Sequence, residues 1–317
     1  MMNVEEAIPA AKAFDKRLPC LDLLRIIAAL AVMAFHWGGG HVGAFPYGYL
    51  GVELFFMISG FVIAASARNR TRFQFVKARA RRLWPTFVLC LALTLCVAPQ
   101  DPVTVLGNLT MIPHLLQVPF VDGVYWSLQV EIGFYAAFAL LVIPNLQRLP
   151  AFSWSWLSIV LLAHWLQWDL VGFAVMEPYA PFFVTGIGVY LVCSRGASSD
   201  WILWALATLA SMIWAFPSQW NPWVCVAIVA TSAVLMLIAP KIRLARPLAS
   251  VSYVLGGISY PLYLIHSQFG THLPFHPAIA AAVVFAFSAL IWWIDGSILK
   301  RKKSEATSGP LVTDLSR

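Results

Sequence analysis

LDLLRIIAALAVMAFHWGG, residues 21–39, is the stretch that decides the fold. It is apolar over nearly the length of about 20 residues that a helix needs to cross a bilayer core of roughly 30 Å. Similar runs recur along the 317 residues, of which 60% are hydrophobic and 11% are charged. A soluble domain carries about 25% charged residues, so we expect lipid to cover most of this protein's surface. Because the runs are continuous and do not alternate with period two, they predict an all-α polytopic membrane protein with about ten transmembrane helices.

The candidate spans follow one another with short connections. They are residues 21–40, 47–67, 83–98, 124–145, 153–168, 177–194, 201–216, 222–240, 252–269 and 277–298. Between spans three and four, the longer connection 99–123 carries a half-apolar stretch that is too short and too Pro-broken to span. We expect it to lie along the membrane interface or to dip over a cavity.

The basic residues indicate the orientation of the chain. All of the 21 Lys and Arg residues except Arg25 lie before the first span, after the last, or in alternate connections. An excess of Lys and Arg marks cytoplasmic loops, so both termini are predicted to be cytoplasmic. We expect a cytoplasmic tail at 1–20, a membrane domain at 21–298 and a basic cytoplasmic tail at 299–317. The net charge of +7 thus reflects membrane topology, and no nucleic-acid partner is expected.

Common motifs for hydrolysis and nucleotide chemistry are missing from the sequence. It contains no GxSxG, HExxH or P-loop pattern, so a serine nucleophile elbow, zinc hydrolysis and ATP chemistry have no support. The five cysteines form no CxxC pair and fall mostly within apolar runs, as buried small side chains do. We expect no metal site.

The first span carries two ionisable side chains on one face. Arg25 and His36 are eleven residues apart, which places them about 20° apart around a helix and roughly 16 Å apart along it. Asp22, three residues before Arg25, can pair with it. A charge within the bilayer usually faces a cavity or a partner. The alternative is an interfacial ion pair at one end of the helix and a polar belt histidine at the other.

Three more ionisable groups are predicted at the same depth as His36. Glu53, Glu131 and His266 each lie in the outer half of a different span, and Ser127 shares a helix face with Glu131. A histidine beside a carboxylate commonly takes a proton from a hydroxyl, so this cluster predicts a proton-transfer site. The alternatives are a buried carboxylate paired for packing at Glu131 and an interfacial residue at Glu53.

The connection RNRTRFQFVKARARRLWP, residues 68–85, carries seven positive charges. Topology signalling, anionic lipid and a phosphate-rich ligand held by arginines would each explain it. Charge alone leaves these three explanations open.

Several segments, in order, resemble acyltransferase family 3, which consists of integral membrane O-acyltransferases. Arg25, ten residues and His36 resemble its Arg/Lys-x10-His motif, and RARRLWP with Arg79 and Arg82 resembles its RxxR motif. YGYLGVELFFMISGFVI, WSLQVEIGFY, APFFVTGIGVYLV and ISYPLYLIHS resemble four further segments. The resemblance runs from about residue 20 to residue 298.

The resemblance implies transfer of an acyl group, commonly acetyl, from cytoplasmic acyl-CoA to a hydroxyl of an extracytoplasmic glycan. It implies a catalytic role for His36, and we add Glu131 as the group that orients it. Arg25, Arg79 and Arg82 would hold the donor. The residues assigned to substrate binding are Glu53, Ser127, Tyr260 and His266. It also implies a multi-pass protein of the bacterial inner (plasma) membrane, in contact with lipid.

Two other functions stay open. A transporter or flippase of a surface-polysaccharide precursor would also need intramembrane charges and a cavity, although we find no clear inverted repeat. A non-catalytic membrane subunit would tolerate alanine at Arg25 and His36. The acceptor, the acyl chain length, a covalent acyl-histidine intermediate and a homo-oligomer are also left open by the sequence.

Overall fold

The computed structural model describes residues 18–68, 70–215 and 221–307, and within these ranges the chain is helical with no strand. Most of the two expected tails, residues 1–17 and 308–317, lies outside the described residues. The long helices are α2 (Pro19–Trp37), α3 (Gly51–Ser66), α4 (Arg72–Val97), α6 (Trp126–Leu141), α7 (Leu149–Leu166), α9 (Ala180–Ser194), α10 (Ser198–Trp214), α11 (Pro222–Ile238), α12 (Arg246–Ile265) and α14 (Pro277–Thr307). Short helices are α5 (Pro102–Leu109), α8 (Asp169–Ala174) and α13 (Gln268–Thr271), and 3-10 turns are η2 (Gly40–Val42), η3 (Pro46–Leu50), η4 (Pro113–Leu116), η5 (Gly123–Tyr125), η6 (Leu146–Arg148) and η7 (Ala239–Lys241). Each expected span overlaps one long helix, which confirms the all-α polytopic class.

Two of the expected spans are short. By length and composition, eight helical segments of the described chain are candidate membrane spans, whereas α9 has 15 residues and α10 has 17. α9 is buried along nearly all of its length and contacts α3, α7 and α10. A helix enclosed by protein need not match the thickness of lipid, because neighbouring helices surround its ends.

Helix α4 begins well before the expected span 83–98. α4 starts at Arg72, where Thr71 and Gln74 form a reciprocal capping box. The basic segment is therefore the first part of a helix and not a loop. Pro85 is accommodated inside that helix. This places Arg79 and Arg82 on a regular helix, three residues apart and close to one face.

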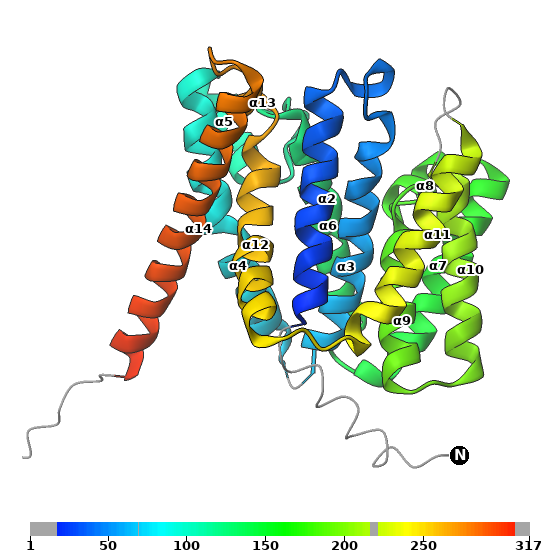
Figure 1. Ribbon diagram of the computed structural model, residues 1–317. Coiled ribbons are helices and arrows are strands. Elements are labelled where there is room, and N and C mark those ends of the chain that lie inside the picture. The colour runs from blue at the N-terminus through cyan, green and yellow to red at the C-terminus, as the bar shows by residue number, and fades with distance from the viewer. Residues whose placement is uncertain (1–17, 69, 216–220, 308–317) are drawn as a thin grey trace, which may run out of the picture.

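Figure 1 shows α2 near the middle of the bundle, between α12 and α3. α12 also packs against α4 and α14, while α9, α10 and α11 lie beyond α3. We call the end of the bundle where α2 begins the arginine side and the end where α2 finishes the histidine side. The assignment of the arginine side to the cytoplasm stays a prediction from the charge distribution.

Glycines bring α3 and α9 into close contact. A Cβ at Gly60 would overlap the backbone of Phe183, and one at Gly186 would overlap the backbone of Met57. Small residues at helix contacts allow close backbone approach, which is the main source of packing energy between membrane helices. This contact fixes α3, whose opposite face forms a wall of the site described next.

Candidate functional site

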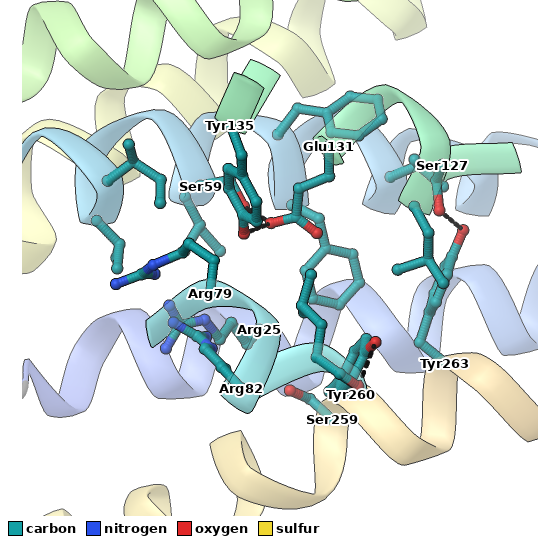
Figure 2. Close-up of a pocket in the computed structure, with 18 of the residues that line it drawn as sticks. Arg25, Ser59, Arg79, Arg82, Ser127, Glu131, Tyr135, Ser259, Tyr260 and Tyr263 are labelled. Atoms are coloured by element: carbon teal, nitrogen blue, oxygen red, sulfur yellow. Dashed lines mark hydrogen bonds between the residues drawn. The ribbon is translucent and has the colours of Figure 1, made fainter. Parts of the chain in front are cut away.

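Three arginines from two helices meet at the arginine side of a cavity within the bundle. Arg25 of α2 and Arg79 and Arg82 of α4 all line this central cavity of about 90 Å³ (Figure 2). Arg79 is only 8% exposed, and its Nη2 donates to Ser66 Oγ at 3.1 Å. Its Nε and Nη1 are buried without a hydrogen-bond partner among the described residues. Buried N–H groups without partners cost free energy, so this side chain suits an anionic ligand.

Glu131 lies farther along the same cavity. Its Oε1 accepts a hydrogen bond from Ser59 Oγ of α3 at 2.6 Å and another from the Tyr135 hydroxyl (Figure 2). Both hydrogen bonds that Glu131 makes among the described residues end on Oε1. The second carboxylate oxygen can therefore accept from a ligand in the cavity.

A hydrogen bond between two hydroxyls marks the histidine side of the central cavity. Ser127 Oγ and Tyr263 Oη are 2.7 Å apart, and both residues line the cavity (Figure 2). The Tyr263 ring also makes an edge contact with Phe55, with centroids 5.6 Å apart. Tyr260, one turn earlier on α12, lines the cavity too, and its hydroxyl donates to the Leu83 carbonyl at 3.4 Å.

Two histidines pair at the ends of α2 and α12. His36 Nδ1 is 3.1 Å from His266 Nε2 and 3.0 Å from the Val32 carbonyl oxygen. His266 Nδ1 is 2.8 Å from the Tyr263 carbonyl oxygen. A carbonyl oxygen only accepts, so each Nδ1 must carry the proton in these hydrogen bonds. In the neutral pair, His36 Nδ1–H then points at the lone pair of His266 Nε2, and Nε2 of His36 keeps its own lone pair for a substrate.

The last turns of α2 and α12 are tied together beside this pair. Trp37 Nε1 donates to the His266 carbonyl at 2.7 Å, and His266 is fully buried. His36 is partly exposed, so it is the ring of the pair that an incoming molecule can reach.

Asp122 is a site residue that the sequence reasoning missed. It is fully buried, and its two oxygens accept from the backbone N–H groups of Gln268 at 2.8 Å and Val124 at 3.1 Å. Burial raises the pKa of Asp122, while these hydrogen bonds and a charged His36 act in the opposite direction. Asp122 thus links the connection before α6 to the turn that follows His266. No local pattern in the sequence distinguishes it from other loop acids.

Among the described residues, neither Glu131 nor Glu53 forms a hydrogen bond with His36 or His266. The partner of His36 is His266, and Glu131 bonds to Ser59 and Tyr135. Glu53 lines neither cavity described here, and one of its carboxylate oxygens is buried without a partner among the described residues. The predicted cluster at one depth is therefore divided between the histidine pair, the central cavity and the far face of α3.

A second, wider cavity adjoins the central one on the arginine side. This vestibule has a volume of about 420 Å³ and shares Arg25, Arg82 and Tyr260 with the central cavity. Asp295 of α14 also lines it. Asp295 is an ionisable residue inside the expected span 277–298. The criterion that selected Glu131, an ionisable group within a span, therefore also applies to Asp295. Among the described residues, no group of three His, Cys, Asp or Glu side chains is placed to hold a metal ion.

Comparison with known proteins gives one family and several relatives. The model of a family described as "Acyltransferase domain" matches residues 18–295. The chain is 31% identical over 173 residues to "Exopolysaccharide production protein ExoZ" of Rhizobium meliloti, covering 49% of this chain and 54% of that protein. It is 36% identical over 83 residues to "O-acetyl transferase" of Shigella phage Sf6, covering 24% of this chain and 25% of the relative.

A third relative is "O-acetyltransferase OatA" of Staphylococcus aureus, 27% identical over 149 residues, which are 44% of this chain and 24% of that protein. The chain thus matches about half of the length of the first of these relatives and about a quarter of the others. No solved structure shows a significant match.

Proposed function

Because the chain belongs to the acyltransferase domain family, we propose that it moves an acyl group, acetyl in the first instance, from cytoplasmic acyl-CoA to a hydroxyl of an extracytoplasmic glycan. The observation that carries the proposal is the line of polar groups through the bundle. It begins at three arginines and passes Glu131 in a narrow cavity that ends at Ser127 and Tyr263. The histidine pair lines neither cavity but lies next to this end, because His266 Nδ1 bonds to the Tyr263 carbonyl oxygen. Family membership favours this function over the transporter and the non-catalytic subunit.

The donor would bind from the arginine side. Phosphate oxygens of CoA can accept from the unpartnered N–H groups of Arg79, and Arg82 adds positive charge. Arg25 lies beside them and is paired with Asp22 at 2.9 Å, as the sequence predicts. The thin acyl-bearing arm would then follow the central cavity toward Ser127 and Tyr263. The bound donor would thus give hydrogen-bond partners to N–H groups of Arg79 that have none among the described residues.

The acceptor hydroxyl would meet His36 from the histidine side. His36 Nε2 takes the hydroxyl proton while the hydroxyl oxygen attacks the thioester carbonyl carbon. The C–O ester bond forms, the C–S bond breaks, and the proton returns from the imidazolium to the departing thiolate. The same lone pair could instead attack the thioester and carry the acyl group as an acyl-histidine, so both versions depend on His36.

His266 would orient His36 and stabilise its charged form. It accepts from His36 Nδ1–H at 3.1 Å, which holds the ring with Nε2 toward the substrate. We therefore give His266 the orienting role that the sequence reasoning gave to Glu131. Glu131 would instead accept a hydrogen bond from an amide N–H of the donor's arm, because it lines the narrow cavity.

The acceptor is proposed to be a cell-surface polysaccharide. One relative is named for exopolysaccharide production and two are named as O-acetyl transferases, so a sugar hydroxyl is the acceptor to try first. Ser127 would contact the acceptor or the acyl group at the end of the cavity, and Tyr260 would line the donor's path. Glu53 keeps its predicted role in substrate binding, although it lines neither of the two cavities. The protein would act in the bacterial inner membrane.

Acetyl transfer by the purified protein tests this function. Radiolabelled acetyl-CoA would be mixed with de-esterified surface polysaccharide of the source cells and protein in detergent micelles. We expect label on the polysaccharide with the wild type and almost none with His36→Ala. His164→Ala is the matched control and should transfer normally, because His164 lies on α7, where it pairs with Glu177 and not with the histidine pair. Equal transfer by His36→Ala would rule out both versions of the mechanism.

A further inference from the structure

One membrane-level carboxylate has no part in the reaction described so far. Asp295 lies on α14 within the candidate span Pro277–Ser297. Its Oδ2 accepts from Thr86 Oγ1 of α4 at 3.3 Å. Its Oδ1 is buried and has no hydrogen-bond partner among the described residues. Asp295 lies two residues before the end of this span, and a buried carboxylate oxygen without a partner costs free energy unless a ligand donates to it.

The vestibule combines a cation, an aromatic ring and this carboxylate. Arg82 adds positive charge, and among the described residues it makes no ion pair. Trp292, also on α14, contributes an indole that packs so close to Gly257 that a Cβ there would overlap it. Asp295 contributes an unused acceptor. A ligand matching all three has a hydrogen-bond donor, a flat aromatic group and an anionic group.

The sizes of the two cavities indicate the shape of that ligand. The vestibule holds about 420 Å³ and the central cavity about 90 Å³, and they join at Arg25, Arg82 and Tyr260. A bulky head in the vestibule could therefore send a thin arm toward Glu131. A phosphate next to Asp295 would be repelled, so the carboxylate should face an N–H group of the head.

We propose that the vestibule binds the nucleotide end of the donor, and that Asp295 Oδ1 accepts a hydrogen bond from the 6-amino group of its adenine. The inference rests on the proposed function, since acyl-CoA is the donor in both. The base lies against Trp292, and the phosphates lie toward Arg82. Asp295 is then a specificity residue for the base, while Glu131 contacts the arm.

A single-group change in the ligand tests this assignment. CoA and an analogue in which purine replaces adenine, so that only the 6-amino group is lost, would be titrated calorimetrically into the full chain in lipid nanodiscs. A hydrogen bond to a charged group is worth roughly tenfold to a hundredfold in affinity. We expect the wild type to bind CoA at least about tenfold more tightly than the purine analogue.

Two variants give the comparison its control. In Asp295→Leu the two ligands should bind within about threefold of each other, because no acceptor is left to read the amino group. Asp169→Leu removes an exposed acid of α8 that lines neither cavity, and it should keep the wild-type ratio. If Asp295→Leu does not fold, Asp295→Ala, which also lacks the acceptor, takes its place in the comparison.

The outcomes separate this inference from the function on which it rests. Equal affinity of the wild type for CoA and the purine analogue overturns the assignment of Asp295 and leaves CoA as donor. Binding of neither ligand overturns the assignment together with the choice of donor. A preference for CoA that survives in Asp295→Leu shows that another group reads the base, and this also overturns the proposal.

Discussion

At the scale of single residues, the histidine pair makes the sharpest prediction. His266→Ala leaves His36 Nδ1–H with the Val32 carbonyl as its acceptor and removes the one from α12, so it should lower kcat by about 10- to 100-fold while the donor KM stays nearly unchanged. His266→Gln keeps a side-chain acceptor and should recover part of the loss. Steady-state kinetics of acetyl transfer would measure both. Equal damage from Ala and Gln would mean that His266 only fills space.

The role of Glu131 can be decided by whether its replacement changes kcat or the donor KM. Glu131→Gln keeps an oxygen for Ser59 and Tyr135 but removes the charge that would hold the donor's arm. We expect the donor KM to rise about tenfold with little change in kcat. A large fall in kcat at constant KM would restore Glu131 to the role of orienting His36.

Asp122 predicts a pH dependence of stability. Burial raises its pKa in the folded state above the ordinary value of about 3.8. The folded state therefore holds this proton more tightly than the unfolded state does. The stabilisation is full below that ordinary pKa and is lost as pH rises through the higher folded value.

Comparison with Asp122→Asn isolates this effect. Between pH 4 and pH 7, the melting temperature of the wild type should fall further than that of Asp122→Asn. The expected result is this difference in slope and not a difference in melting temperature at one pH. Thermal unfolding in one detergent at several pH values would measure it. Parallel curves for the two proteins would contradict the assignment.

At the scale of helices, the α3–α9 contact should not tolerate even a methyl group. In Gly60→Ala or Gly186→Ala, the new methyl group would overlap the backbone of the facing helix, which should cost about 1–3 kcal/mol of stability. Gly296→Ala is the matched control, because a Cβ there meets nothing within 4 Å. It should be neutral or slightly stabilising, since Ala favours helices. Melting temperatures in detergent would separate the three variants, and equal values would contradict the packing argument.

Hydrophobic runs predict where helices lie far better than where they begin. The length of each run places α2, α11 and α14 well, because lipid requires about 20 apolar residues. α4 begins 11 residues before its expected span of 83–98, since the capping box at Thr71 and not hydropathy starts that helix. α9 is shorter than a simple span because protein encloses it.

At the scale of the whole molecule, the sequence predicts how deep a residue lies in the membrane better than which neighbouring helix its side chain faces. That His36, Glu131 and His266 lie in the outer half of the membrane follows, as a prediction, from their places in the spans. Their partners do not, because these depend on which helices are neighbours. α2 packs between α12 and α3, so His36 meets His266 while Glu131 meets Ser59 of α3. Asp122 lies in a connection, where neither hydropathy nor periodicity constrains its position.

The overall orientation has its own test. If the basic residues mark the cytoplasm, single cysteines placed at Arg72 and Arg243 should react with a membrane-impermeant maleimide only from the inner face of the membrane. A cysteine at Thr271, beyond the histidine pair, should react only from the outer face. The native cysteines would first be replaced by alanine. Labelling of all three positions from the same side would contradict the proposed direction of transfer.

Transfer across a sealed bilayer is the measurement that tests the central claim most directly. Radiolabelled acetyl-CoA would be enclosed in proteoliposomes, with the de-esterified polysaccharide outside only. The proposed path from the arginines to His36 predicts label on the external polysaccharide with the wild type and none with His36→Ala. Labelling only when donor and polysaccharide share one side of the membrane would contradict it.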